Sequence, residues 1–259
     1  MKFDIGQYDI NFSKLKKFKP NIVIHLAWSG IPDFSYKISR ENFKNSVNFL
    51  SNIIQIESCK KIIITGSSYE ALLKNKQNYK MMKRIKHFVH FKNLLKNWAL
   101  SKCNSKNISF AWLRIFYVYG PYQRKNSLIS ILYENLKKKK NPDIKHPLSY
   151  NDFIFVDDVT KIIKKAIKFK FKSGVYDIGR GKLVSVWSIA QIVEKILNKK
   201  NLIFNNINKK KLKNKIVINP IAKFKKNEFN TKIKFTKLKI GIFKTIKNYK
   251  KNDNNKNSI

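Results

Sequence analysis

One apolar run limits the folds that this chain of 259 residues can adopt. Ile108–Phe116 is almost continuously apolar, which is typical of a central parallel strand covered on both faces. Gly120, followed by proline, predicts a turn that stops the run. Ligands of open parallel α/β sheets bind beyond the carboxyl ends of the strands, so we expect a site whose mouth is formed by Tyr117, Tyr119 and Tyr122.

Strand-like and helix-like segments alternate along most of the chain. The predicted strands are residues 21–27, 60–65, 108–116, 153–156, 175–178 and 202–205. The predicted helices are residues 39–57, 83–101, 128–140, 157–169 and 185–198. Asp157 or Asp158 is placed to cap one helix, and Ser185 to cap another. The alternation favours crossover units and a parallel sheet.

Five segments in a fixed order carry a resemblance to a known family. They are Lys19–Ala27, Lys61–Ser68, Arg114–Arg124, Asn151–Val159 and Ser173–Gly181. The third contains Arg-x-Phe-x-x-Tyr-Gly-Pro, and the fourth ends in Val-Asp-Asp-Val. Together they resemble the NAD-dependent epimerase/dehydratase family, the extended short-chain dehydrogenase/reductases that remodel nucleotide sugars. The resemblance implies an α/β fold with a doubly wound, Rossmann-like parallel sheet and a smaller C-terminal substrate lobe.

The resemblance also implies how the chain is organised. We expect one domain at residues 1–249, a substrate lobe mainly from residues 120–150 and 180–249, and a polar, frayed tail at 250–259. Family members begin with a strand, a Gly-x-x-Gly-x-x-Gly turn and a helix that hold a pyrophosphate. This sequence has no such turn. We therefore expect an N-terminally truncated protein that lacks the first strand-turn-helix units.

The cofactor implied by the resemblance is NAD or NADP, bound with impaired affinity because the glycine-rich turn is missing. Asp4 and Ile5 resemble the family's pair that touches the adenine, and Ala27 resembles a residue that lines the cofactor. Lys92 corresponds to the family lysine that reaches the ribose. These four residues are the expected cofactor contacts.

In the family, a Tyr and a Lys four residues later meet a Ser or Thr at a strand end. The Lys cation lowers the pKa of the Tyr, so that the phenolate can take a proton from a sugar hydroxyl. Here Ser67 and Ser68 occupy the strand end, but Phe88 stands four residues before Lys92. A rival register uses Tyr79, which also has a Lys four residues on but follows Ser68 too closely. We favour the Phe88 register, in which the proton carrier is missing.

On the substrate side, Tyr117 stands where the family often has Asn, and Asn151 where it has Arg. Arg124 remains as a partner for a diphosphate. For some residues a structural role competes with a functional one. Ser67 could simply end a strand, and His25 between apolar neighbours is more typical of a core residue. No His, Cys and Asp spacing indicates a metal site.

The formal net charge of +41 raises the alternative of a nucleic-acid-binding protein. The cations are almost all Lys and are spread along the chain, whereas base reading favours Arg. We therefore expect no specific nucleic-acid partner. No apolar run reaches the roughly 18 to 20 residues of a membrane span, and no signal peptide is visible, so we expect no membrane partner and a cytoplasmic protein. Cys59 and Cys103 are expected to be reduced.

The functional expectation is a nucleotide-sugar epimerase, dehydratase or reductase-like protein that is weakly active or inactive. A second hypothesis is a non-catalytic partner of an intact paralogue, or a homodimer, that pairs through the helix at residues 83–101. A third is a basic nucleic-acid binder. These hypotheses differ in what they predict for hydride transfer, for association and for salt dependence.

Overall fold

The computed structural model describes residue 5 and residues 12–72, 79–199, 216–223 and 233–256. Asp4 and the predicted strand at residues 202–205 lie outside these ranges. The chain divides into two compact units. The first comprises residues 1–115, 163–177 and 224–231, and the second residues 116–162, 178–223 and 232–259.

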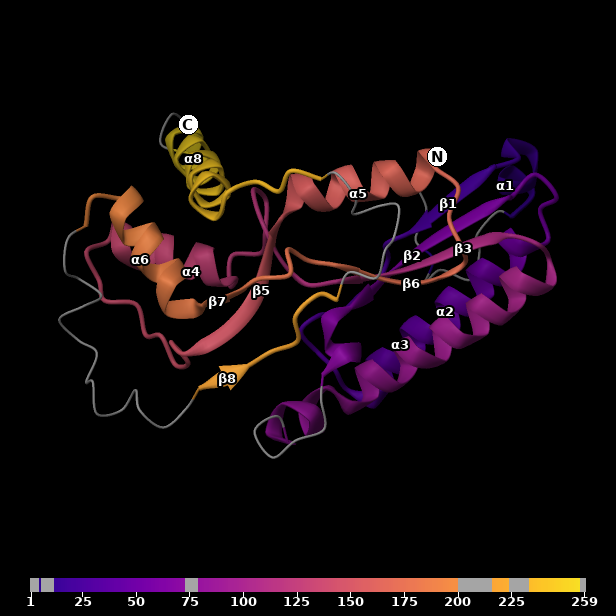
Figure 1. The fold of residues 1–259 in the computed structure, drawn as a ribbon, viewed down its shortest axis with the longest axis horizontal. Helices are drawn as coiled ribbons and strands as arrows, with labels where there is room; N and C mark the ends of the chain where they lie inside the picture. The colour runs from indigo at the N-terminus through magenta and orange to yellow at the C-terminus, as the bar shows by residue number, and fades with distance from the viewer. Residues whose placement is uncertain (1–4, 6–11, 73–78, 200–215, 224–232, 257–259) are drawn as a thin grey trace. The chain divides into compact units, whose positions relative to one another are not determined.

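The first unit is built on a four-stranded sheet with the order β1, β2, β3, β6 (Figure 1). Its strands are β1 (Ile22–His25), β2 (Lys61–Ser67), β3 (Ser109–Ile115) and β6 (Gly174–Ile178). β2 pairs in parallel with both β1 and β3. The middle residues of β2 and β3 are fully buried, as expected of parallel strands covered on both faces.

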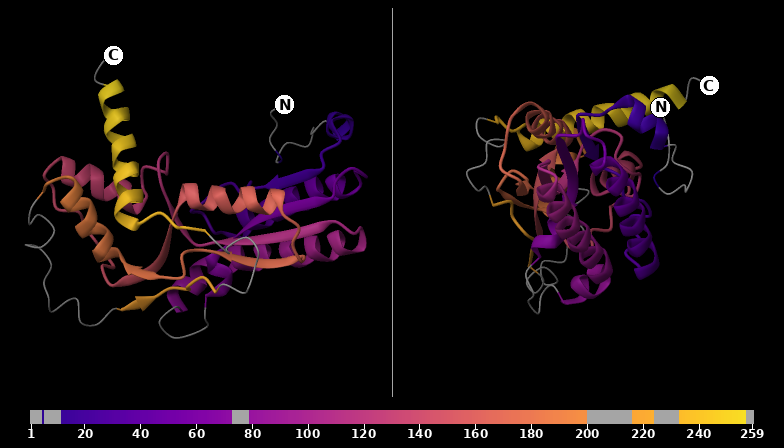
Figure 2. Two further views of the ribbon diagram at one scale, coloured as in Figure 1. Left: turned by 45° about the horizontal axis from the view of Figure 1, so that its top comes forward. Right: turned by 90° about the vertical axis from the view of Figure 1, so that its right-hand side faces the viewer.

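Helices cover both faces of this sheet. α2 (Tyr36–Ile54) and α3 (Tyr79–Ser105) lie side by side on one face, and the part of α5 (Val156–Lys168) that belongs to this unit, residues 163–168, lies on the other (Figures 1 and 2). The unit also contains α1 (Phe12–Phe18) and the short 3-10 helix η1 (Ser68–Ala71). This arrangement confirms the predicted α/β class with parallel strands.

The second unit contains a smaller sheet centred on β5 (Ser149–Phe155). β4 (Tyr117–Tyr119) and β8 (Val217–Ile218) pair with β5 in parallel, and β7 (Leu183–Ser185) pairs with it antiparallel. Its helices are α4 (Leu128–Lys137), α6 (Val186–Ile196) and α8 (Leu238–Lys256). A separate buried cluster joins these helices to the sheet.

The apolar run Ile108–Phe116 forms the single strand β3, as predicted. β3 ends at Ile115, and the chain then enters β4 of the second sheet before the turn at Gly120. The expectation that Tyr119 lines a site mouth is wrong, because its side chain is 1% exposed in the core of the second unit. Tyr119 packs tightly against α8, where a Cβ at Gly241 would overlap the Tyr119 hydroxyl. Tyr122 is exposed as expected.

The C-terminal residues differ from the frayed tail that we expected at 250–259. α8 continues to Lys256, and Asp253 accepts hydrogen bonds from Tyr133 Oη and Lys137 Nζ, each at 2.7 Å. These contacts join the last turns of α8 to α4. Polar composition predicted a tail, but it did not reveal this tertiary partner.

The predicted helix caps had different outcomes. Ser185 caps α6 as expected, because its Oγ accepts a hydrogen bond from the Ser188 amide at 3.0 Å. α5 begins at Val156, so Asp158 lies inside its first turn and is not the cap. Its buried carboxylate instead accepts hydrogen bonds from the amide of Thr236, at 2.7 Å, and from its hydroxyl, at 3.0 Å.

No helix in the described ranges combines the length and apolar character needed to cross a membrane.

Candidate active site

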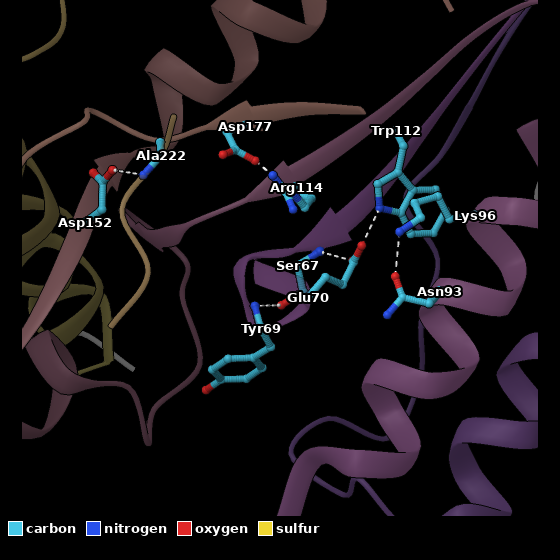
Figure 3. Close-up of polar contacts among 10 residues, drawn as sticks. All are labelled: Ser67, Tyr69, Glu70, Asn93, Lys96, Trp112, Arg114, Asp152, Asp177 and Ala222. Atoms are coloured by element: carbon cyan, nitrogen blue, oxygen red, sulfur yellow. Dashed lines mark hydrogen bonds and ion pairs between the residues drawn. The ribbon is translucent and has the colours of Figure 1, made fainter. Parts of the chain in front are cut away.

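The carboxyl end of β2 is shaped by a capping box. Ser67 Oγ accepts a hydrogen bond from the Tyr69 amide at 3.3 Å, and the Glu70 carboxylate accepts one from the Ser67 amide at 2.7 Å (Figure 3). This reciprocal pair fixes the turn from strand to helix. Ser67 therefore has a structural role at this strand end, and Ser68 begins η1 beside it.

Glu70 also links the strand end to the neighbouring strand. Its second oxygen accepts a hydrogen bond from Trp112 Nε1 at 2.8 Å. The backbone of β2 and the Trp112 side chain approach closely here, because a Cβ at Gly66 would overlap Trp112 Nε1 and lie 2.7 Å from Glu70 Oε1. Burial raises the pKa of Glu70, while its hydrogen bonds to Ser67 and Trp112 oppose that rise.

Lys92 lies on α3 beside this strand end and is almost completely buried, with 5% of its surface exposed. Its Nζ donates a hydrogen bond to the Thr65 carbonyl at 2.9 Å. The ammonium lies 4.0 Å from the ring centroid of Trp28 and 5.6 Å from that of Trp112, in cation–π contact with both. Burial lowers the pKa of Lys92 to about 8, although the charge of Glu70 opposes this.

Phe88 lies one turn before Lys92 on α3 and is 3% exposed. Its ring makes edge contacts with Trp28, Phe34 and Tyr69, at centroid distances of 5.5, 5.1 and 6.4 Å. The Phe88 side chain that contacts these three rings is a hydrocarbon and has no ionisable atom. Burial raises the pKa of Tyr69, and the nearby Arg84 opposes the rise.

Tyr79, the rival candidate, is the first residue of α3 and its side chain is 66% exposed. It lies nine residues before Phe88, which corresponds to about 14 Å along the helix axis. The structure thus brings Phe88 and Lys92 together with the strand end, and it places Tyr79 at the start of the helix.

The other expected residues of the first unit have varied environments. Ile5 packs against the first core cluster, and Ala27 is exposed just after β1. His25 is buried, lies 3.0 Å from the Ser46 hydroxyl and has its pKa lowered to about 4, first by burial and then by the charge of Lys92. It is a core histidine, as expected.

The three expected substrate residues all lie in the second unit. Tyr117 is 41% exposed and packs on Phe153 with the ring centroids 4.6 Å apart. Arg124 is exposed after the Gly120 turn, and its carbonyl accepts hydrogen bonds from Ser127. Asn151 lies on β5 and donates a long hydrogen bond of 3.4 Å to the Ser149 carbonyl.

Sequence reasoning overlooked several residues of the first unit's site. Trp28, Phe34 and Trp112 surround Phe88 and Lys92, but no local pattern marks them. Glu70 could have been found, because Ser67-x-x-Glu70 has the spacing of a capping box. Across the described ranges, no group of three or more His, Cys, Asp or Glu side chains could hold a metal ion.

A parallel sheet covered by helices, with polar side chains at the carboxyl ends of its strands, is typical of the doubly wound α/β class, in which ligands bind beyond those ends. Residues 1–179 match the model of the NAD dependent epimerase/dehydratase family. Because this match covers more than half of the chain, the protein belongs to that family.

Two curated proteins are similar to this chain in sequence. CDP-abequose synthase of Salmonella muenchen is 29% identical over 91 residues, which is 34% of this chain and 31% of that protein. The chain spans less than two thirds of the length of the curated relatives that it matches.

Two solved structures share the fold. The UDP-N-acetylglucosamine 4-epimerase of Methanobrevibacter ruminantium M1, in complex with UDP-N-acetylmuramic acid, has a TM-score of 0.79 and 18% identity over 97% of this chain and 83% of its own. A Tyr-to-Phe variant of the UDP-glucuronic acid 4-epimerase of Bacillus cereus, solved with a fluorinated UDP-sugar and NAD, has a TM-score of 0.73 and 21% identity over 97% and 81%. At these identities the similarity shows the fold.

Proposed function

We propose that this protein is a nucleotide-sugar epimerase, dehydratase or reductase-like member of its family in which NAD(P)-dependent hydride transfer is weak or lost. The observation that carries the proposal is Phe88, which is buried one turn before Lys92. A phenylalanine can neither accept nor donate the proton that a sugar hydroxyl must exchange during its oxidation. General acid–base catalysis of this kind contributes about 10² to 10⁴ in rate.

The remaining polar groups do not replace a phenol. Lys92 Nζ donates to the Thr65 carbonyl and faces two indole rings, and the side chain one turn before it on α3 has no hydroxyl whose pKa it could lower. The Glu70 oxygens accept hydrogen bonds from Ser67 and Trp112. Ser67 retains a hydroxyl proton that it could donate to a ligand, which is consistent with residual but slow chemistry.

The cofactor of the family, NAD or NADP, supplies the hydride acceptor when it is bound. The residues present do not fit an intact dinucleotide site. Lys92, the expected ribose contact, is 5% exposed, and its Nζ is engaged by the Thr65 carbonyl and two indole rings. The burial of Lys92 supports impaired cofactor binding, with Ile5 and Ala27 left as the described candidates for contact.

The proposed substrate class is a nucleotide sugar. Support comes from the names of the relatives, which act on or bind CDP- and UDP-linked sugars. Tyr117, Arg124 and Asn151 are the proposed contacts, because an exposed ring, a guanidinium and an amide can together hold a sugar and a diphosphate.

Turnover with NAD(H) or NADP(H) and a panel of nucleotide sugars, followed by nicotinamide absorbance, tests the proposal. We expect turnover at or near background for the wild type, and an increase of about 10² or more over that level for Phe88→Tyr. Tyr79→Phe is the matched control and should change nothing. Wild-type turnover that disappears in Tyr79→Phe would refute the assignment of the missing proton carrier to position 88.

A non-catalytic partner role is the second candidate. The side chain of Leu94 on α3 is 39% exposed, which supports pairing with a paralogue or a second copy through this helix. Light scattering should then detect a dimer in the wild type that Leu94→Glu dissociates. A monomer at every concentration, alone and with an intact paralogue, would count against this role.

A further inference from the structure

A surface cavity of about 400 Å³ lies in the first unit, between the loop that precedes α2 and the first turns of α3. One wall is formed by Pro32, Asp33, Phe34 and Ser35, and the other by Lys83, Arg84, Lys86 and His87. The cavity is separate from the buried contacts of Lys92 Nζ, and neither Ser67 nor Phe88 lines it.

The wall on α3 gathers positive charge. Lys83, Lys86 and His87 share one face of the helix, because residues three and four apart are neighbours. Like charges at this spacing repel each other, at a cost of a few tenths of a kcal/mol per pair. In the described part of the chain, ion pairs are held by Arg114, Lys137 and Lys161, and none involves a cation of this cavity.

The opposite wall is held in place by its own contacts. The Asp33 carboxylate accepts a hydrogen bond from the Ser35 amide at 2.8 Å, and the Asp33 amide donates to the Gly30 carbonyl at 2.7 Å. Ser35 caps α2, so the amides and positive end of that helix begin at the cavity. The wall therefore adds a favourable dipole for an anion. The charge of the Asp33 carboxylate opposes an anion, but the three cations Lys83, Arg84 and Lys86 outnumber it.

An aromatic ring fixes the position of one cation. The Arg84 guanidinium lies over the Phe34 ring, 5.7 Å from its centroid, and Phe34 in turn packs against Phe88 and Tyr69. Stacking on a buried aromatic cluster leaves the guanidinium edge available for bidentate hydrogen bonds, the geometry that suits phosphate oxygens.

We propose that this cavity is a binding site for the phosphate or diphosphate group of a small phosphorylated ligand. Three cations, a histidine and a helix N-terminus converge on a space large enough for such a group. A ligand with several negative charges would relieve the repulsion between the α3 cations. A single carboxylate could relieve that repulsion only in part. The site is independent of the hydride-transfer chemistry considered above.

Calorimetric titration of the intact chain with inorganic pyrophosphate and with UDP, at about 0.15 M salt, tests the proposal. Arg84→Gln is expected to weaken pyrophosphate binding about tenfold or more, because it removes a charge-assisted contact. Lys80→Gln is the matched control, since it removes one exposed charge from the same helix outside the cavity. We expect it to change the affinity by less than about twofold.

The possible results separate clearly. Among the affinities that Arg84→Gln weakens, equal values for pyrophosphate and UDP would support recognition of the phosphates alone, and tighter binding of UDP would identify a nucleotide as the source. UDP binding that Arg84→Gln leaves unchanged would place the nucleotide elsewhere and count against the proposal. Equal weakening by Arg84→Gln and Lys80→Gln would overturn the proposal, because it would show a response to net charge only. If the wild type gives the circular dichroism spectrum of a folded protein but binds neither pyrophosphate nor UDP, the proposal is overturned as well.

Discussion

At the residue scale, Glu70 has a larger structural role than its single charge suggests. Its two oxygens satisfy the Ser67 amide and the Trp112 indole, which belong to neighbouring strands. A buried donor that loses its acceptor costs about 1 to 3 kcal/mol. The carboxylate therefore stabilises both the strand end and the packing of Trp112.

We predict that Glu70→Ala lowers the free energy of unfolding by about 3 kcal/mol, because two buried donors lose their acceptor. Glu70→Gln keeps one carbonyl oxygen and should cost about 1 kcal/mol. Urea denaturation measures both values. Equal and small losses in the two variants would show that solvent replaces the carboxylate at this site.

Lys92 makes stability depend on pH in an unusual direction. Burial lowers its pKa to about 8 in the folded protein, against an ordinary value of 10.5. Between these two pH values the unfolded chain binds the proton that the folded chain has released, so the free energy of unfolding rises with pH. The increase amounts to about 3 kcal/mol over the whole interval.

We therefore predict that Lys92→Met removes this contribution. The difference between wild-type and variant unfolding free energies, measured by urea denaturation at pH 8 and pH 10, should grow in favour of the wild type as the pH rises. Taking the difference cancels the titration of buried groups such as Tyr119 and Cys103, which both proteins share. An identical pH slope in the two proteins would contradict the prediction.

At the scale of elements, Lys61 on β2 caps the C-terminal end of α5, a helix that is distant in the sequence. Lys61 Nζ donates hydrogen bonds to the carbonyls of Ala166, Ile167 and Phe169, at 2.9, 2.7 and 2.9 Å. The last carbonyls of a helix have no partner within it, and a cation at this end also suits the helix dipole. Lys61 thus joins the central sheet to the end of α5.

We predict that Lys61→Met destabilises the protein by about 1 to 2 kcal/mol, because these carbonyls lose a shared donor. Amide exchange in the last turn of α5 should also become faster. Lys60→Met, which changes an exposed neighbour, should have almost no effect on either measurement. Equal effects of the two substitutions would assign the loss to net charge.

At the scale of the whole molecule, the excess of 56 Lys and Arg over 15 Asp and Glu dominates long-range electrostatics. Such a charge attracts polyanions without recognising their sequence. We predict that the protein binds duplex DNA at low salt and that binding disappears by about 0.2 M salt.

Fluorescence anisotropy with two unrelated DNA sequences and with heparin measures this behaviour. Equal affinities and equally steep salt dependence are expected for all three. Tight binding that persists above about 0.2 M salt for one DNA sequence would instead support a dedicated nucleic-acid function.

Much of the first unit could be predicted from the sequence, because its strands and helices are long and strongly patterned. The apolar residues of β2 and the long helices on either side of it in the sequence were recognisable from their residue patterns. The order of the motifs indicated the family. The short strands β4, β7 and β8 could not be predicted, because two or three residues carry no periodicity.

The candidate site shows the same division. The residue types at positions 67, 88 and 92, and hence the absence of a phenol four residues before Lys92, are determined by the sequence itself. Only the tertiary structure decided that Lys92 lies between two indole rings and that Tyr119 is buried against α8. The physical reason is that local pattern governs secondary structure, whereas burial and ionisation depend on side chains brought together from distant parts of the chain.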